Sequence, residues 1–132
     1  MRSTRSRGAD GDRGSAAVEF VLVGTLVVLI GLAVVQLVIA LHVRNTLTSS
    51  AYEGARHAAR ADRDLGDGSE RATTMARDAL AGLDTVASAR ADQVAGATVV
   101  TVSLEAPVPL VGLWGPGTMT VQARAIEEGR DG

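Results

Sequence analysis

The strongest pattern in the chain is a run of uncharged residues from Phe20 to Val43. As a helix, these 24 residues would be about 36 Å long, enough to cross a hydrocarbon core of about 30 Å. The alternative is a removable secretory signal, but the apolar region of such a signal typically spans only about 7–15 residues. The pattern therefore favours a permanent membrane span.

The pattern beyond the span is that of a helix with one apolar face. Small and apolar residues recur at helical spacing after Arg44, and Gly54 is the one residue there that weakens a helix. We therefore expect one long helix from about Ala16 to Arg63, half in the membrane and half outside it. The Asp64–Gly68 stretch is expected to end this helix.

A second, shorter helix is predicted downstream. Asp67 and Glu70 have the spacing of a capping box, and an apolar stripe runs from Ala72 to Leu83. Gly82 lies near the expected C-terminal end of this helix. The segment is predicted to be a short amphipathic helix.

The period of the pattern then changes from about four to two. Alternation predicts strands at Thr98–Glu105 and Met119–Ile126, and a weaker alternation at Val86–Gln93 allows a third. The Pro- and Gly-rich residues 106–117 between the two clearer strands are expected to stay unpaired, with Trp114 filling part of the small core. The expected fold class is α+β: a long N-terminal helix, a short amphipathic helix and a small antiparallel sheet of two or three strands.

Composition narrows the function. The chain has 132 residues, 13 basic residues (all Arg) and 15 acidic ones, a balance that argues against nucleic-acid binding. It has no Cys, which excludes disulfides and thiolate chemistry. His42 and His57 would lie about 22 Å apart on one helix and cannot share a metal. The sequence indicates no catalytic group, metal, cofactor, nucleic acid or small-molecule substrate, and so no enzyme.

Two motifs flank the span. The junction from Gly14 to Phe20 reads GSAAVEF: an Arg-rich leader ends in Gly, and a Glu follows five residues later at the head of the apolar run. After the span, residues 52–59 read YEGARHAA. The first motif resembles the processing site of type IV prepilins, most closely the Flp/Tad subgroup, and the second resembles the E-G-A-R-x-A-A segment of TadE-like pseudopilins. Together they cover roughly residues 14–60.

The resemblance implies a function and a set of residues. A prepilin peptidase, a membrane aspartyl protease, would cut between Gly14 and Ser15 at the cytoplasmic face, leaving Glu19 at mature position five with Phe20 after it. The family motif after the span corresponds to Glu53, Gly54, Ala55 and Arg56. The implied partners are the peptidase, other Tad-system membrane subunits and pilins, and the lipid bilayer.

The residues themselves support this interpretation. Glu19 stands at the edge of the apolar run. Placing a carboxylate in or near the membrane costs free energy, so its presence there suggests a functional role. Cleavage would give Ser15 a free amine about 6 Å away along the helix, which Glu19 of the same or an adjacent subunit can neutralise. Ala17, Gly24 and Gly31 are spaced by seven and form a candidate face for helix packing.

The expected organisation has five parts, from leader to tail: 1–14 as a basic leader without structure of its own, 15–43 as the transmembrane half of the long helix, 44–66 as its outer half, 67–126 as a small α+β domain, and 127–132 as a flexible tail. The leader and the stretch Arg44–Arg63 carry four Arg each, so charge selects no orientation. The resemblance implies a cytoplasmic N-terminus and an extracytoplasmic C-terminal domain. The alternative is an uncleaved single-pass anchor whose outer domain binds another envelope protein; a secreted globular protein is a third hypothesis.

Overall fold

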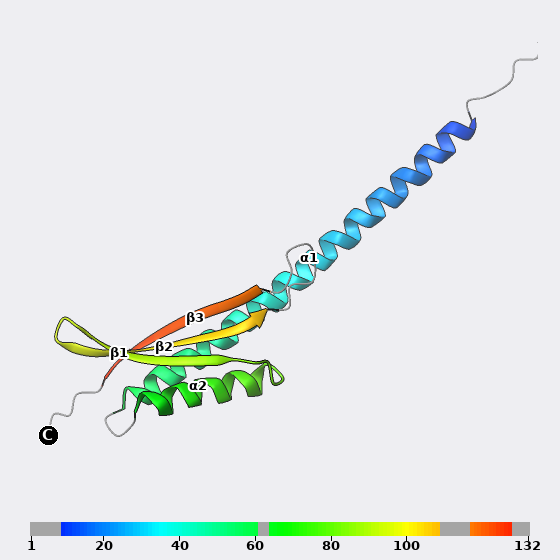
Figure 1. Cartoon of the computed structure of the whole chain (residues 1–132). Helices are drawn as coiled ribbons and strands as arrows, with labels where there is room; N and C mark the ends of the chain where they lie inside the picture. Colours follow the sequence, from blue (N-terminus) through cyan, green and yellow to red (C-terminus); the bar gives the residue numbers. More distant parts are fainter. Residues whose placement is uncertain (1–8, 61–63, 109–116, 128–132) are drawn as a thin grey trace, which may run out of the picture. The chain divides into compact units, whose positions relative to one another are not determined.

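The computed structural model describes residues 9–60, 64–108 and 117–127 (Figure 1). Its elements, in chain order, are α1 (Ala9–Ala58), α2 (Leu65–Ala79), β1 (Val86–Val94), β2 (Ala97–Val108) and β3 (Gly117–Ile126). The expected α+β class is confirmed, with three strands rather than two. The chain divides into two compact units, residues 1–37 and 38–132, and α1 contributes to both.

The sheet is antiparallel in the order β1-β2-β3, with the longest strand in the centre. Alternate residues of β2 point to one face and are buried there: Val100, Val102, Leu104, Ala106 and Val108. The register sets Val102 between Ala89 of β1 and Ala123 of β3, so small side chains flank a larger one on this face. The weak alternation over Val86–Gln93 is therefore a real edge strand.

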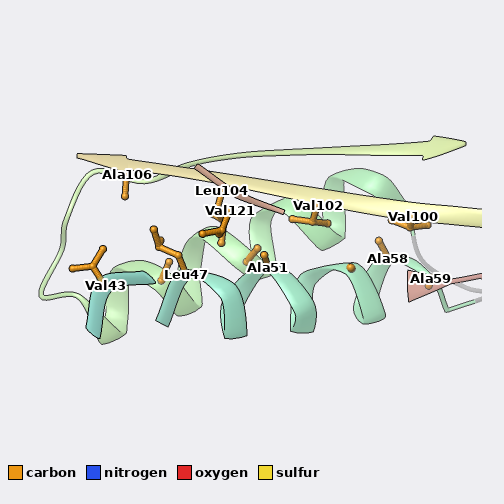
Figure 2. Packing of buried hydrophobic residues seen from close by; sticks show 13 residues of the cluster. Val43, Leu47, Ala51, Ala58, Ala59, Val100, Val102, Leu104, Ala106 and Val121 are labelled. Carbon is orange, nitrogen blue, oxygen red and sulfur yellow. The ribbon is translucent and has the colours of Figure 1, made fainter. Parts of the chain in front are cut away.

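The end of α1 belongs to the core of the second unit. Its buried side recurs about every fourth residue, and comprises Val43, Leu47, Ala51, Ala55 and Ala58. Figure 2 shows labelled members of this row facing the buried side chains of β2. Leu47 and Leu104 are fully buried, and removing such side chains typically costs about 2–5 kcal/mol. The half of the helix that was predicted to lie outside the membrane thus forms one side of the core of the second unit.

The two helices meet at ends that differ from those expected. α1 ends at Ala58, five residues before Arg63, and α2 begins at Leu65, two residues before the predicted cap Asp67. Asp64 is the N-cap: its Oδ1 accepts a hydrogen bond of 2.8 Å from the backbone N–H of Asp67. The predicted capping box of Asp67 and Glu70 is therefore wrong by one turn, because Asp64 caps first.

Tight backbone turns close both α2 and the β1–β2 hairpin. After α2 the N–H of Gly82 bonds to the carbonyl oxygen of Arg77 at 2.8 Å, with Ala81 at φ 53° and Gly82 at φ 78°. The hairpin loop is the two residues Ala95 (φ 51°) and Gly96 (φ 83°), which is a type I′ pattern. In each turn an alanine occupies a left-handed position ahead of a glycine.

Pairing of β2 continues through Pro107, contrary to the expectation that residues 106–117 stay unpaired. Pro107 pairs with Thr118 and Val108 with Gly117. A proline fits here because β1 begins at Val86, opposite Glu105, so beyond Glu105 β2 has only β3 as a hydrogen-bonded neighbour. Trp114 and the rest of 109–116 lie outside the described residues, as do residues 128–132 of the expected tail.

Candidate functional site

The proposed cleavage site lies on the surface of α1. Ser15, Glu19 and Phe20 are exposed, and a side chain added at Gly14 would meet no atom within 4 Å. Ser15 and Glu19 are one helical turn apart and share a face. Glu19 makes no hydrogen bond or ion pair to any residue that the structure describes.

The helix extends further back than expected. α1 begins at Ala9, so the last six residues of the leader are helical and the Gly14–Ser15 bond lies inside the helix. The physical reason is that adding a residue to an existing helix gains one hydrogen bond without a new nucleation cost. The expectation of a leader without structure is therefore corrected for residues 9–14, while residues 1–8 lie outside the described part.

The apolar segment of α1 meets the requirements of a membrane span. It is the one helix in the described chain that is long and apolar enough to cross a membrane, and none of its most apolar window is buried. Large side chains such as Leu22 and Val28 are 64% and 69% exposed, which in water would be highly unfavourable. The hydroxyl of Thr25 donates to the carbonyl oxygen of Val21 at 2.7 Å, which satisfies it within the helix.

The small residues of the span lie on the face opposite the carboxylate. Successive helical residues turn by about 100°, so Ala17 and Glu19 differ by about 200°. Added side chains at Gly24 and Gly31 would meet nothing within 4 Å. A neighbouring helix packed against the small residues would therefore not contact Glu19 of the same chain.

The two central residues of the E-G-A-R motif, Gly54 and Ala55, have a structural role. Ala55 is fully buried in the core, and Gly54 lies against α2. A Cβ built on Gly54 would lie 2.5 Å from the carbonyl oxygen of Gly68 and 2.7 Å from the Cβ of Ala72. The sequence marked Gly54 as a weak helix position and as part of the family motif, but its contact with Gly68 was not predicted, since no pattern along the chain shows which helix lies opposite.

The two charged residues of the motif point away from that contact. Glu53 is half-buried and Arg56 is exposed. The Arg56 guanidinium carbon lies 5.8 Å from the ring centroid of Tyr52, within the range of a cation–π interaction. The structure therefore separates the motif into a packing pair and a surface pair.

Comparison with protein families finds a match that covers the span and both of its flanks. The family model described as TadE-like protein matches residues 14–56. Residues 14–56 are therefore similar to TadE-like proteins. No curated protein and no solved structure matches the chain.

The TadE-like match confirms the resemblance predicted from the two motifs. It begins at Gly14 and ends at Arg56, and covers about a third of the chain. The family is one of structural pilus components rather than enzymes. A TadE-like segment together with the apolar helix α1 fits a membrane-anchored, pilin-like protein.

Proposed function

We propose that this protein is a TadE-like pseudopilin, a structural membrane component of a Tad/Flp-type pilus assembly or a related secretion apparatus. The observation that carries this proposal is the extent of the family match. It starts at the residue before the proposed cut and ends at Arg56, so it includes the first motif, the span and the E-G-A-R part of the second motif.

Processing after Gly14 is the chemical event in this proposal. A prepilin peptidase hydrolyses the Gly14–Ser15 bond, and a glycine at that point leaves room for the backbone in a narrow cleft. Because α1 begins at Ala9, the first helical turns unwind before the bond can extend into a protease. Helix ends open at low free-energy cost, which makes this step accessible.

Cleavage changes the electrostatics of the new N-terminus. Ser15 gains a positive amine at the start of the shortened α1, and Glu19 lies one turn further on the same face. A carboxylate in the first turns also interacts favourably with the helix dipole. Glu19, from the same chain or an adjacent subunit, neutralises the amine where it enters the apolar contact.

The proposed function also assigns a location and a role to the second unit. With the leader cytoplasmic, the second unit lies outside the cytoplasm, where it contacts other Tad-system subunits and pilins. The protein acts as a substrate and then as a structural part, and needs no cofactor. The competing function is an uncleaved single-pass anchor whose outer domain binds another envelope protein, which the exposed apolar helix would support equally.

N-terminal sequencing and intact-mass spectrometry of the protein from membranes of its own host distinguish these functions. We expect a mature chain of 118 residues that begins at Ser15. Gly14→Val should block cleavage by crowding the scissile bond, whereas Gly11→Val, a matched substitution within the leader, should leave it intact. An intact start in the unmodified protein supports the anchor, a start beyond residue 40 a secreted protein. Mature protein from Gly14→Val contradicts the assigned site.

A further inference from the structure

A groove runs between the end of α1 and the edge strand β3. It has a volume of about 460 Å³ and is lined by Tyr52, Arg56 and Ala59 from α1 and by Arg124, Ala125 and Ile126 from β3. Tyr52 is 51% exposed and Ile126 is 68% exposed, so the groove offers open apolar surface beside two guanidinium groups.

The two arginines of the groove have unused binding capacity. Arg56 lies over the Tyr52 ring, and neither Arg56 nor Arg124 forms an ion pair with any residue in the described part of the chain. A guanidinium presents a fork of donors that fits a carboxylate. The groove is therefore suited to a protein segment with carboxylates.

This chain carries such a segment on the other flank of α1. From Asp64 to Glu70 there are three carboxylates and no basic residue, and Asp64 and Glu70 are exposed. Asp64 and Asp67 use one oxygen each in the N-cap of α2, which leaves their charges and their remaining oxygens available. Arg71, which follows directly, lowers the local charge but does not cancel it.

The acidic segment and the groove lie at the same level along α1. Gly68, within the acidic segment, touches Gly54 and Ala58, while Tyr52 and Arg56 line the groove. Gly54 and Tyr52 differ by about 200° around the helix, so the two surfaces face away from each other. One chain cannot join them, but two copies with parallel α1 helices can.

We propose that the acidic first turn of α2 in one copy binds the Arg56–Arg124 groove of the next copy. The contact is heterologous, because each copy offers a different surface on each flank, and so it can be repeated along a row of subunits. This inference rests on the proposed function, in which copies are anchored side by side in one membrane. We assign a second copy of this chain as the occupant of the groove, because every copy carries both the basic groove and the acidic segment that complements it.

The absence of Cys from the chain allows a direct test by disulfide cross-linking of the full-length protein in its own membranes. Ile126→Cys and Arg71→Cys are placed in separate, co-expressed copies and oxidised. We expect a cross-linked dimer from this pair and little from either variant alone. A matched control replaces Arg71→Cys by Ser88→Cys, an exposed position on β1 away from the acidic turn.

Charge exchange makes the test specific. Arg124→Glu in the groove copy, or Glu70→Arg in the other, should each reduce the cross-link about fivefold, and the two together should restore it. Glu70 is chosen because, unlike Asp64 and Asp67, it takes no part in the N-cap. The proposal is overturned by a cross-link insensitive to these charges or no stronger than the control, by Ile126→Cys dimers alone, or by cross-linking of Ile126→Cys to another protein instead.

The same samples separate this proposal from the proposed function. Their N-terminus and membrane fraction are measured alongside the cross-link. A Ser15 start in membrane-bound protein without the cross-link overturns the subunit contact alone, whereas an uncleaved or secreted chain contradicts the proposed function.

Discussion

Gly54 of α1 and Gly68 of α2 face each other so closely that neither can carry a side chain. A Cβ on Gly54 would lie 2.5 Å from the carbonyl oxygen of Gly68, and a Cβ on Gly68 would lie 2.7 Å from the carbonyl oxygen of Gly54 and would overlap the Cβ of Ala58. The obstacles include backbone atoms, which cannot move unless the helices separate. The glycine of the E-G-A-R motif thus fixes how α2 packs on α1.

Gly54→Ala is therefore expected to destabilise the second unit by about 1–3 kcal/mol, the usual cost of overpacking, despite the higher helix propensity of Ala. The measurement is thermal or denaturant unfolding of the full-length protein in detergent. Gly31→Ala is the matched control, since its added methyl group meets nothing within 4 Å. Equal stability of Gly54→Ala and the parent would contradict the close contact.

Ala95→Asn is expected to stabilise the β1–β2 hairpin. Ala95 has φ 51°, a left-handed conformation that costs a residue with an ordinary side chain roughly 1–2 kcal/mol and that Asn tolerates better. Asn before Gly96 also creates the preferred pair for a type I′ turn. Unfolding midpoints should rise for Ala95→Asn and fall for Ala95→Val, and a lower midpoint for the Asn variant would argue against this turn.

Glu19→Ala should separate cleavage from assembly. The peptidase, as the family resemblance implies, reads mainly the Gly before the cut, so the variant should still begin at Ser15. Assembly should fail, because an unpaired amine in an apolar contact costs several kcal/mol. Glu19→Gln should fall between, since it can accept a hydrogen bond from the amine but cannot neutralise it.

Cleavage and co-purification with other assembly subunits are measured in the same Glu19 strains. Val21→Leu, just outside the motif, serves as a control that keeps the span apolar and leaves the carboxylate in place. If Glu19→Ala is cleaved normally and also assembles fully, Glu19 is an ordinary residue of the first helical turns.

A reporter that is active only outside the cytoplasm, fused after Gly132, should be active. The proposed orientation puts the leader in the cytoplasm and residues 44–132 on the opposite side of the membrane. The same reporter fused before Met1 is the matched control and should be inactive. An inactive C-terminal fusion of normal abundance would reverse the orientation and remove the basis for cleavage by a cytoplasmic-face peptidase.

The sequence by itself determined the features that depend on local periodicity. The uncharged run Phe20–Val43 is long enough to be recognised as a membrane span from its own residues. The alternation in β2 and β3 indicates directly which face of the sheet is buried. The two motifs around the span identified the segment that the TadE-like family model also matches. Each of these signals comes from residues close together in the chain, so the physics that produces them is local.

Helix ends were determined only in part. The Asp64–Gly68 stretch contains signals that can stop one helix or start another, and its pattern predicted that Asp64 helps to end the first helix while Asp67 caps the second. In the structure Asp64 caps α2 with Asp67 as its partner, while α1 has already ended at Ala58. Which competing cap forms depends on where α2 finds a surface to pack against, and that surface is Gly54 and its neighbours.

Only the tertiary structure decided the roles that need distant partners. Gly54 is required only because Gly68 lies opposite it, and Pro107 fits the central strand only because the pairing of β2 with β1 stops at Glu105, two residues earlier. Arg56 and Arg124 are 68 positions apart, and they line one groove because β3 lies beside α1. Contacts of this kind depend on the shapes of both surfaces, which no pattern along a single segment contains.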